Sequence, residues 1–190
     1  ISMHDVDTVY SVPILLNKQK VDKTIIEKLK IQSKQPNLND WKRVVKAKLM
    51  PEKEVNVSFV GKYTELKDSY KSINEALEHA GIKNKAKVNI NFVEAENISS
   101  KNIKKTLKNA DAVLVPGGFG ERGIEGMILA CKYARENNIP YLGICLGMQV
   151  AIIEYARNVL NLKGANSTEF DQNTKHLSLI HISEPTRPIH

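Results

Sequence analysis

The sequence predicts an α/β fold in which a parallel sheet carries helices on both faces, preceded by a short helical segment. Two observations predict this fold. From Val55 onward, short runs of aliphatic and β-branched residues alternate with longer amphipathic stretches, which is the pattern of βαβ units. Before Val55 the chain shows helical periodicity only. With 190 residues, 42% of them apolar, the chain is long enough to bury a core.

The first 52 residues are expected to form a separate segment. Helical patterns cover Val21–Leu29 and Leu38–Leu49, and neither is able to build a core alone. The second pattern ends at Pro51, because proline cannot continue a helix and the residues around it have linker character. A domain boundary near residue 52 follows.

From residue 53 the pattern indicates a flavodoxin-like sheet, whose strands should bring functional loops to their carboxyl ends. The predicted strands are Val55–Val60, Val88–Val93, Ala112–Val115 and Pro140–Ile144. The predicted helices between and after them are Ser69–His79, Lys101–Lys108, Ile124–Asn137 and Met148–Leu160. In the last helix an apolar stripe lies along one face and is formed by Met148, Ile152, Tyr155, Ala156 and Val159.

Composition excludes several classes of protein. Only two cysteines are present, too few for a disulfide framework, which favours a reducing compartment and a cytoplasmic protein. No apolar run approaches the roughly 20 residues that span a bilayer. The net charge of +7 is not gathered beside stacking aromatics. The lysines that share one predicted helical face are expected to be solvated rather than to bind nucleic acid; they are Lys101, Lys104, Lys105 and Lys108.

The main chemical signal is Cys145, which lies in Gly143-Ile-Cys-Leu-Gly147 between a predicted strand and a predicted helix. A nucleophile in such an elbow adopts a cramped backbone conformation that flanking glycines make possible. A small buried cysteine in a glycine-containing turn is the alternative. Cys131, by contrast, falls on the apolar face of a predicted helix and is expected to pack in the core.

An acyl-transfer nucleophile needs hydrogen-bond donors for the oxygen that becomes negative. The backbone N–H of Leu146 is one candidate donor. Gly118 is the second, in the loop Pro116–Gly120, where missing side chains allow a substrate to reach the backbone. A flexible turn or a phosphate loop is the alternative, although the Gly-Lys-Ser/Thr ending of a P-loop is absent.

Five segments together resemble one enzyme family. They are Pro116–Gly123, Leu142–Gln149, Ala165–Asp171, Gly61–Tyr63 and Asp68–Ile73. The first two are typical of class I glutaminases in general, and the other three resemble the glutaminase domain of the CTP synthases. The resemblance runs from about Ile1 to about His176. It implies that residues 1–52 are the C-terminal end of a synthase (amidoligase) domain with its linker, and that 53–176 are the N-terminal part of a glutamine amidotransferase domain.

The resemblance also implies residue roles. Cys145 would be the nucleophile, and Glu169 would bind the α-amino group of glutamine. Contacts to the oxyanion and the glutamine would come from Gly118, Leu146, Gly147, Met148 and Gln149. Asp5, Val6 and Asp7 would lie where the synthase domain holds the adenine of ATP.

The partners implied by the resemblance are small molecules. L-glutamine would be hydrolysed at Cys145, and the ammonia would pass to the synthase domain, which makes CTP from UTP and ATP. ATP, UTP and magnesium would be bound by that domain, so no cofactor and no metal site are expected in these residues. A homotetramer is implied for the whole enzyme, and neither nucleic acid nor a membrane is an expected partner.

The sequence departs from the family in its last part. The family places a His-x-Glu pair after the nucleophile, and none of His176, His181 and His190 stands in that pattern, so the chain by itself is expected to be inactive. Residues 177–190 are expected to be a non-native tail without regular structure. Two alternatives remain: another cysteine enzyme on a flavodoxin-like sheet, and a non-catalytic module.

Overall fold

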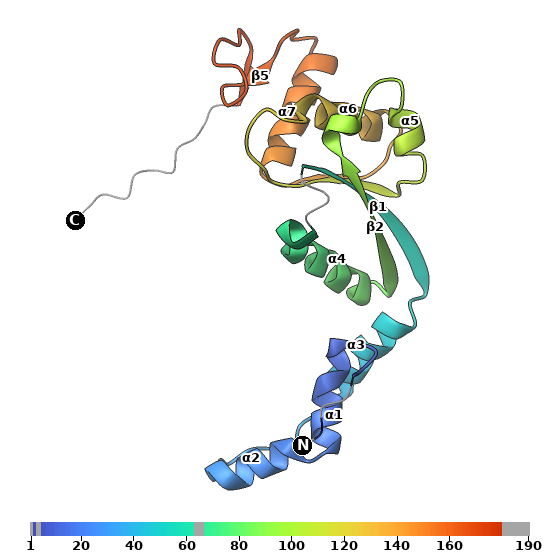
Figure 1. Cartoon of the computed structure of the whole chain (residues 1–190), viewed down its shortest axis with the longest axis vertical. Helices are drawn as coiled ribbons and strands as arrows, with labels where there is room; N and C mark the ends of the chain where they lie inside the picture. Colours follow the sequence, from blue (N-terminus) through green and yellow to red (C-terminus); the bar gives the residue numbers. More distant parts are fainter. Residues whose placement is uncertain (1, 3–4, 63–66, 180–190) are drawn as a thin grey trace, which may run out of the picture. The chain divides into compact units, whose positions relative to one another are not determined.

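The computed structural model describes residues 2, 5–62 and 67–179 (Figure 1). The chain divides into two compact units. The first contains residues 1–54 and 72–88, and the second contains residues 55–71 and 89–190.

The first unit is mainly helical. Its short helix η1 spans Val9–Ser11, and its α-helices are α1 (Val12–Lys18), α2 (Val21–Leu29), α3 (Asn39–Leu49) and most of α4 (Lys71–Lys83). The predictions of α2 and α3 are confirmed. The sequence did not predict α1, in which Pro13 lies in the first turn, where a helix does not need its missing N–H. Lys48 of α3 pairs with Glu78 of α4 at 2.8 Å.

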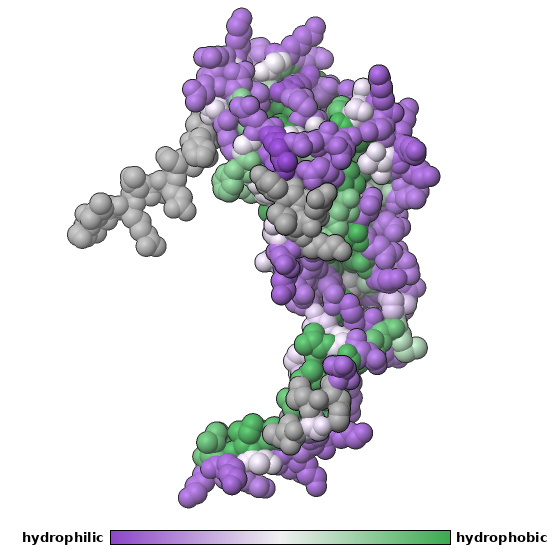
Figure 2. Space-filling view, in the orientation of Figure 1, coloured by the Kyte–Doolittle hydropathy of each residue, from purple (hydrophilic) through white to green (hydrophobic). Residues whose placement is uncertain are grey.

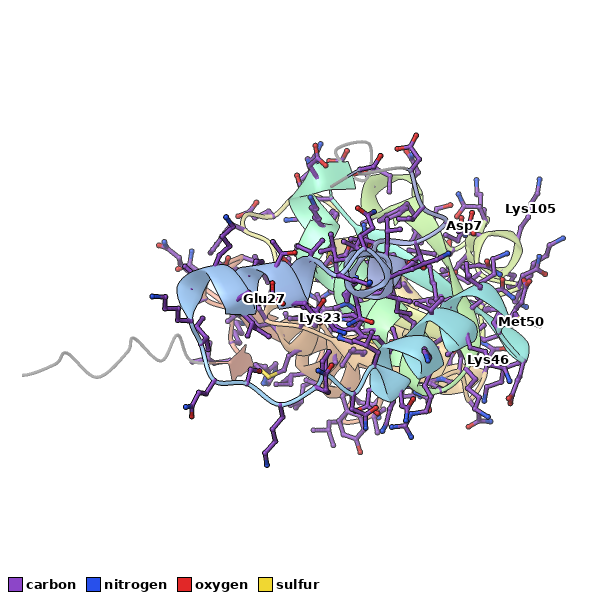
Figure 3. The ribbon with its side chains drawn as sticks, turned by 90° about the horizontal axis from the view of Figure 1, so that it is seen from below. Asp7, Lys23, Glu27, Lys46, Met50 and Lys105 are labelled. Atoms are coloured by element: carbon purple, nitrogen blue, oxygen red, sulfur yellow. The ribbon has the colours of Figure 1, made fainter. Side chains whose placement is uncertain are left out.

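The helical segment before residue 53 buries little apolar surface of its own. On α2 only Val21 is buried, while Ile25 and Leu29 are exposed, and Figure 2 shows hydrophobic residues gathered along this helix. Lys23 and Glu27 of the same helix are exposed (Figure 3). This agrees with the prediction that the segment cannot form a core alone.

A four-stranded sheet in the order β2-β1-β3-β4 underlies the fold (Figure 1). Its strands are β1 (Lys53–Gly61), β2 (Ala86–Glu94), β3 (Ala112–Val115) and β4 (Tyr141–Gly143). β1 pairs with β3, and β3 with β4, both in parallel. All four predicted strands are therefore present, and the predicted parallel sheet flanked by helices is confirmed.

The core of the second unit lies between β3 and two helices, α6 (Ile124–Glu136) and α7 (Leu146–Asn158). Val113, Val115 and Val150 are among its fully buried residues, and Cys131 packs there as predicted. The predicted helix at residues 101–108 shortens to one turn, α5 (Ile103–Thr106). The four lysines of the predicted segment, Lys101, Lys104, Lys105 and Lys108, are exposed, as expected for a solvated face.

Most of the apolar stripe predicted for α7 points away from the core, and of its five residues only Ala156 is buried. Met148, Ile152, Tyr155 and Val159 are exposed, whereas Leu146, Val150 and Ile153 on the other side are buried. Both sides of α7 are apolar, so helical periodicity alone could not decide which one packs against the sheet. The exposed stripe borders a groove of about 460 Å³, to which Leu160, Leu162 and Leu177 also contribute.

Regular structure continues past residue 176, contrary to the expectation for the last residues. β5 (Asn166–Ser167) pairs in parallel with β6 (Leu177–Leu179). One of the backbone hydrogen bonds at this pairing runs from the Asn166 N–H to the carbonyl of His176, directly before β6, at 3.1 Å. Residues 180–190, the rest of the predicted tail, lie outside the described residues.

None of the helices in the described part of the chain is long and apolar enough to cross a membrane.

An ion pair joins α6 to α7. Glu154 is 1% exposed, and both of its oxygens accept hydrogen bonds from Arg135 at 2.8–3.2 Å. Arg135→Met should lower the free energy of unfolding by about 2 kcal/mol, because it leaves the buried carboxylate of Glu154 without its partner. The loss is smaller than for a fully buried pair, because Arg135 is partly solvated. Denaturant unfolding monitored by circular dichroism measures this loss.

The double variant Arg135→Met with Glu154→Leu is the matched control. Replacing both charges by apolar groups is expected to keep stability within about 1 kcal/mol of the unchanged chain. If the double variant lost as much stability as the single one, the loss would come from packing of the Arg135 side chain rather than from the unpaired charge.

Candidate active site

Cys145 lies at the sharp turn between β4 and α7. It is the N-cap residue of α7, and its φ of 53° and ψ of −103° depart from the regions that side chains other than glycine favour. The residue is exposed. The alternative of a small buried cysteine in this turn is therefore wrong, and the strained, exposed position predicted for a nucleophile is confirmed.

Two glycines make this turn possible. A Cβ at Gly143 would lie 2.4 Å from the Gly147 carbonyl group, and a Cβ at Gly147 would lie 2.1 Å from the Val115 carbonyl oxygen. Both distances are far below van der Waals contact, so only glycine fits at these positions. The Tyr141 hydroxyl of β4 donates a hydrogen bond to the Gly147 carbonyl at 2.8 Å and holds the start of α7 against the sheet.

The glycine loop after β3 lies beside Cys145. A Cβ placed on Gly117 would be 3.5 Å from the Cys145 Cβ, and one on Gly118 would be 3.3 Å from the Leu146 Cδ2 atom. The loop therefore reaches the elbow with Gly117 beside Cys145 and with Gly118 beside the next residue, Leu146. The N–H of Leu146 belongs to the first turn of α7, where amides have no partner within the helix.

Gln149 offers an unused acceptor near the nucleophile. Its N–H, like that of Met148, donates to the Cys145 carbonyl, at 3.2 Å and 3.0 Å respectively. Its side-chain Oε1 atom is buried and has no hydrogen-bond partner among the described residues. A buried acceptor without a donor costs about 1–3 kcal/mol, which a bound ligand with N–H groups would recover. Met148, in contrast, directs its side chain to solvent.

Glu169 is presented on a turn fixed by buried neighbours. Its N–H donates to the Oγ atom of Ser167, a residue that is 4% exposed. Arg157 of α7 donates from Nε to the carbonyl of Ala165 at 2.7 Å, which ties the segment to the helix. The carboxylate of Glu169 is exposed, and its charge acts on Lys62 beside the glycine loop.

Lys62 is the residue that sequence reasoning did not assign to the site. It follows β1 and is 2% exposed, although it carries an ammonium group. Its Nζ donates to the carbonyl of Phe119 at 2.9 Å and to the carbonyl of Gly120. Burial lowers the pKa of Lys62, and the charge of Arg122 lowers it further, while Glu169 and Glu96 act in the opposite direction. In the sequence, the feature that could have pointed to Lys62 is its place at the carboxyl end of a predicted strand, where functional residues gather.

The residues expected near ATP belong to the first unit. Asp5 and Asp7 are exposed (Asp7 is labelled in Figure 3), and Val6 is half-buried. Exposed carboxylates repel phosphate groups, so the side chains of Asp5 and Asp7 do not suit a triphosphate. Among the described residues no group of three or more His, Cys, Asp or Glu side chains is placed to hold a metal ion.

The elbow, the exposed cysteine and the adjacent glycine loop define a site for acyl transfer, and comparison with known families agrees. The family model described as glutamine amidotransferase class-I matches residues 65–186. The chain belongs to this family.

Within the family the chain is similar to CTP synthases. It is 54% identical over 176 residues to the CTP synthase of Caldanaerobacter subterraneus subsp. tengcongensis, an alignment that covers 93% of this chain and 33% of that protein. A structure of the glutaminase domain of Trypanosoma brucei CTPS with bound acivicin is 42% identical, with a TM-score of 0.61 over 64% of this chain and 48% of that one. The chain thus spans a third of one relative and about half of the other.

Gly147→Ala should lower the free energy of unfolding by about 3 kcal/mol, because the added methyl group collides with the Val115 carbonyl. Helix propensity alone would predict a more stable variant, since alanine is about 1 kcal/mol more favourable than glycine inside a helix. Denaturant unfolding measures the difference. Gly117→Ala is the control and should cost no more than about 1 kcal/mol, because its methyl group makes an ordinary contact. Equal losses in the two variants would contradict the proposed collision.

Iodoacetamide at pH 8 should alkylate Cys145 and leave Cys131 unmodified in the folded chain. Burial, with the nearby charge of Glu154, raises the pKa of Cys131 to about 12. Only about 10⁻⁴ of that thiol is then ionised at pH 8, and the thiolate is the reactive form. Peptide mass spectrometry after timed alkylation measures both sites. Addition of denaturant is the control, since it should make Cys131 reactive; rapid labelling of Cys131 without denaturant would contradict its burial.

Proposed function

We propose that this chain carries part of a glutamine-hydrolysing site, with Cys145 as the nucleophile that attacks the side-chain amide of L-glutamine. The single observation that carries the proposal is the geometry of Cys145. It is exposed in a strained turn at a helix N-terminus, with Gly117 beside it and Gly118 beside the following residue, Leu146. Strain of this kind persists at sites where it serves a function.

The chemistry proceeds through two acyl-transfer steps. The thiolate of Cys145 attacks the amide carbon, and the carbonyl oxygen becomes an oxyanion near the backbone N–H groups of Leu146 and Gly118. The C–N bond then breaks, ammonia leaves with an added proton, and a thioester remains. Water hydrolyses the thioester to give glutamate and the free thiol. Donors fixed beside the developing charge lower the barrier because they need no reorganisation during the reaction.

Recognition of glutamine would use groups around the nucleophile. Gln149 has a buried Oε1 acceptor without a partner among the described residues, which suits an N–H donor of the substrate. The carboxylate of Glu169 suits the α-ammonium group, because charge-assisted hydrogen bonds are short and strong. Gly147 and Met148 would contribute through their backbones at the start of α7.

The whole protein is proposed to be a CTP synthase, in which ammonia from glutamine aminates UTP with ATP as the second substrate. The identity of 54% over nearly the entire chain supports this proposal. ATP, UTP and magnesium would be held by parts of such a protein beyond the residues described, and Asp5, Val6 and Asp7 would meet only the adenine. A cytoplasmic homotetramer remains part of the same proposal.

Turnover by these 190 residues is expected to be very slow. None of the five histidines stands in the His-x-Glu pattern that the resemblance requires, and a positioned acid–base group typically contributes about 10² to 10⁴ in rate. Ammonia release from glutamine by the purified chain should therefore match that of Cys145→Ala within about twofold. Release well above the variant would mean that a base exists within the chain.

Covalent capture tests the nucleophile without requiring turnover. A glutamine analogue whose amide nitrogen is replaced by a chloromethyl group should form a thioether with Cys145, with loss of chloride. Labelling should saturate with analogue concentration, and L-glutamine should protect against it. Cys145→Ala is the matched control and should not react. Labelling that neither saturates nor responds to glutamine would defeat the assignment of a glutamine site.

A further inference from the structure

The glycine loop after β3 has no side chains of its own to fix its shape between Pro116 and Phe119. Phe119 is 87% exposed, so its ring does not anchor the loop either. Gly120 has a φ of +76°, and a Cβ placed there would meet nothing within 4 Å. A segment of this composition loses much conformational entropy when it is ordered. Some neighbouring group must therefore hold it if Gly118 is to stay beside Cys145.

Lys62 is in the position to do so. Its Nζ donates to two consecutive carbonyl oxygens of the loop, those of Phe119 (2.9 Å) and Gly120. The aliphatic stem of the same side chain runs past Gly118, since a Cβ on Gly118 would lie 4.0 Å from the Lys62 Cδ atom. The same Cβ would lie 3.3 Å from the Leu146 Cδ2 atom, which belongs to the residue that follows the nucleophile. Gly118 thus lies next to both Lys62 and Leu146.

The backbone of Lys62 is itself fixed. The hydroxyl of Tyr70 donates to the Lys62 carbonyl, and the Tyr70 ring packs against Phe59 with a centroid distance of 4.7 Å. Tyr70 and Phe59 are 8% and 0% exposed, respectively. A series of buried contacts therefore runs from the centre of β1 through Tyr70 and Lys62 to the glycine loop.

Burial of an ammonium group is costly unless oxygen atoms replace its water. In this structure the two carbonyl oxygens of the loop do so, with charge-assisted hydrogen bonds that are stronger than neutral ones. The same bonds bind the loop as tightly as they bind the lysine. If this side chain only filled space, an apolar residue could do so without the cost of burying an ammonium group.

We propose that Lys62 is a positioning residue: through the carbonyls of Phe119 and Gly120 it fixes the backbone of Gly118 beside Cys145. The inference rests on the proposed function, because the fixed amide matters only if an oxyanion forms there. Lys62 touches neither the nucleophile nor the reacting carbon. It acts on the reaction through the loop.

Hydrogen exchange measured by mass spectrometry tests the effect on the loop directly. Lys62→Met keeps the stem and removes the ammonium, and it should accelerate exchange in peptides covering residues 116–120 by about tenfold. Lys105→Met is the matched control. Lys105 is an exposed lysine of α5 (Figure 3), and its loss should leave exchange in that loop unchanged. Unchanged exchange in Lys62→Met would overturn the proposal.

Covalent labelling then tests the consequence for the site. The chloromethyl ketone analogue of glutamine should label Cys145 about tenfold more slowly in Lys62→Met, because its carbonyl oxygen needs the Gly118 amide. Iodoacetamide needs no oxyanion donor, so its rate at Cys145 should change by less than about twofold. Lys62→Arg, which retains a buried donor, should restore part of the analogue's rate. Equal slowing with both reagents would contradict a positioning role.

The two proposals fail in different ways. If the unchanged chain shows no saturable labelling by the analogue, the proposed function fails, while loop exchange still decides the role of Lys62. Circular dichroism first checks that Lys62→Met folds; if it does not, Lys62→Gln carries the same measurements. Failure of both variants to fold would assign Lys62 to general stability and overturn the inference.

Discussion

The contact between the start of α7 and the end of β3 is the constraint on which the site depends. Gly147 approaches the Val115 carbonyl so closely that any side chain would collide with it. This approach forces the chain to turn within two residues of β4, which gives Cys145 its positive φ and lifts it out of the core. The same approach sets Leu146 against the glycine loop. The positions of Cys145 and of Leu146, one of the two candidate donors, therefore follow from one backbone contact.

Two buried charges stabilise different parts of this arrangement. Arg135 and Glu154 join α6 to α7, so they keep the helix that carries the elbow in register with the rest of the core. Lys62 binds backbone carbonyls, and so it acts on a loop that apolar packing cannot fix. Burying a charge is unfavourable unless polar partners replace its water. Glu154 is paired with Arg135, and Lys62 donates to two backbone carbonyls distant in sequence. These interactions hold α7 and the glycine loop in place, and so they fix the geometry of the site.

The strands and most helices of the second unit could be predicted from sequence because their signals are local. Cys145 and Gly118 could be placed together because parallel strands bring consecutive loops to one edge. The buried face of α7 could not, since Met148, Ile152 and Tyr155 are as apolar as the residues that pack inside. For Lys62 the sequence indicated only its place at the carboxyl end of a strand, because a lysine is expected to be exposed and only tertiary structure shows its partners.

The exposed apolar stripe of α7 lies close to the elbow at the start of that helix. Met148 and Ile152 begin one turn after Cys145, so the apolar groove and the nucleophile are carried by the same rigid element. The inner face of α7 is already fully used, because Val150 and Ile153 are completely buried. The outer face leaves apolar area in contact with water, which is unfavourable in proportion to that area. Any group that covered this face would remove the unfavourable area, stabilise α7, and thereby hold the turn that contains Cys145 more firmly.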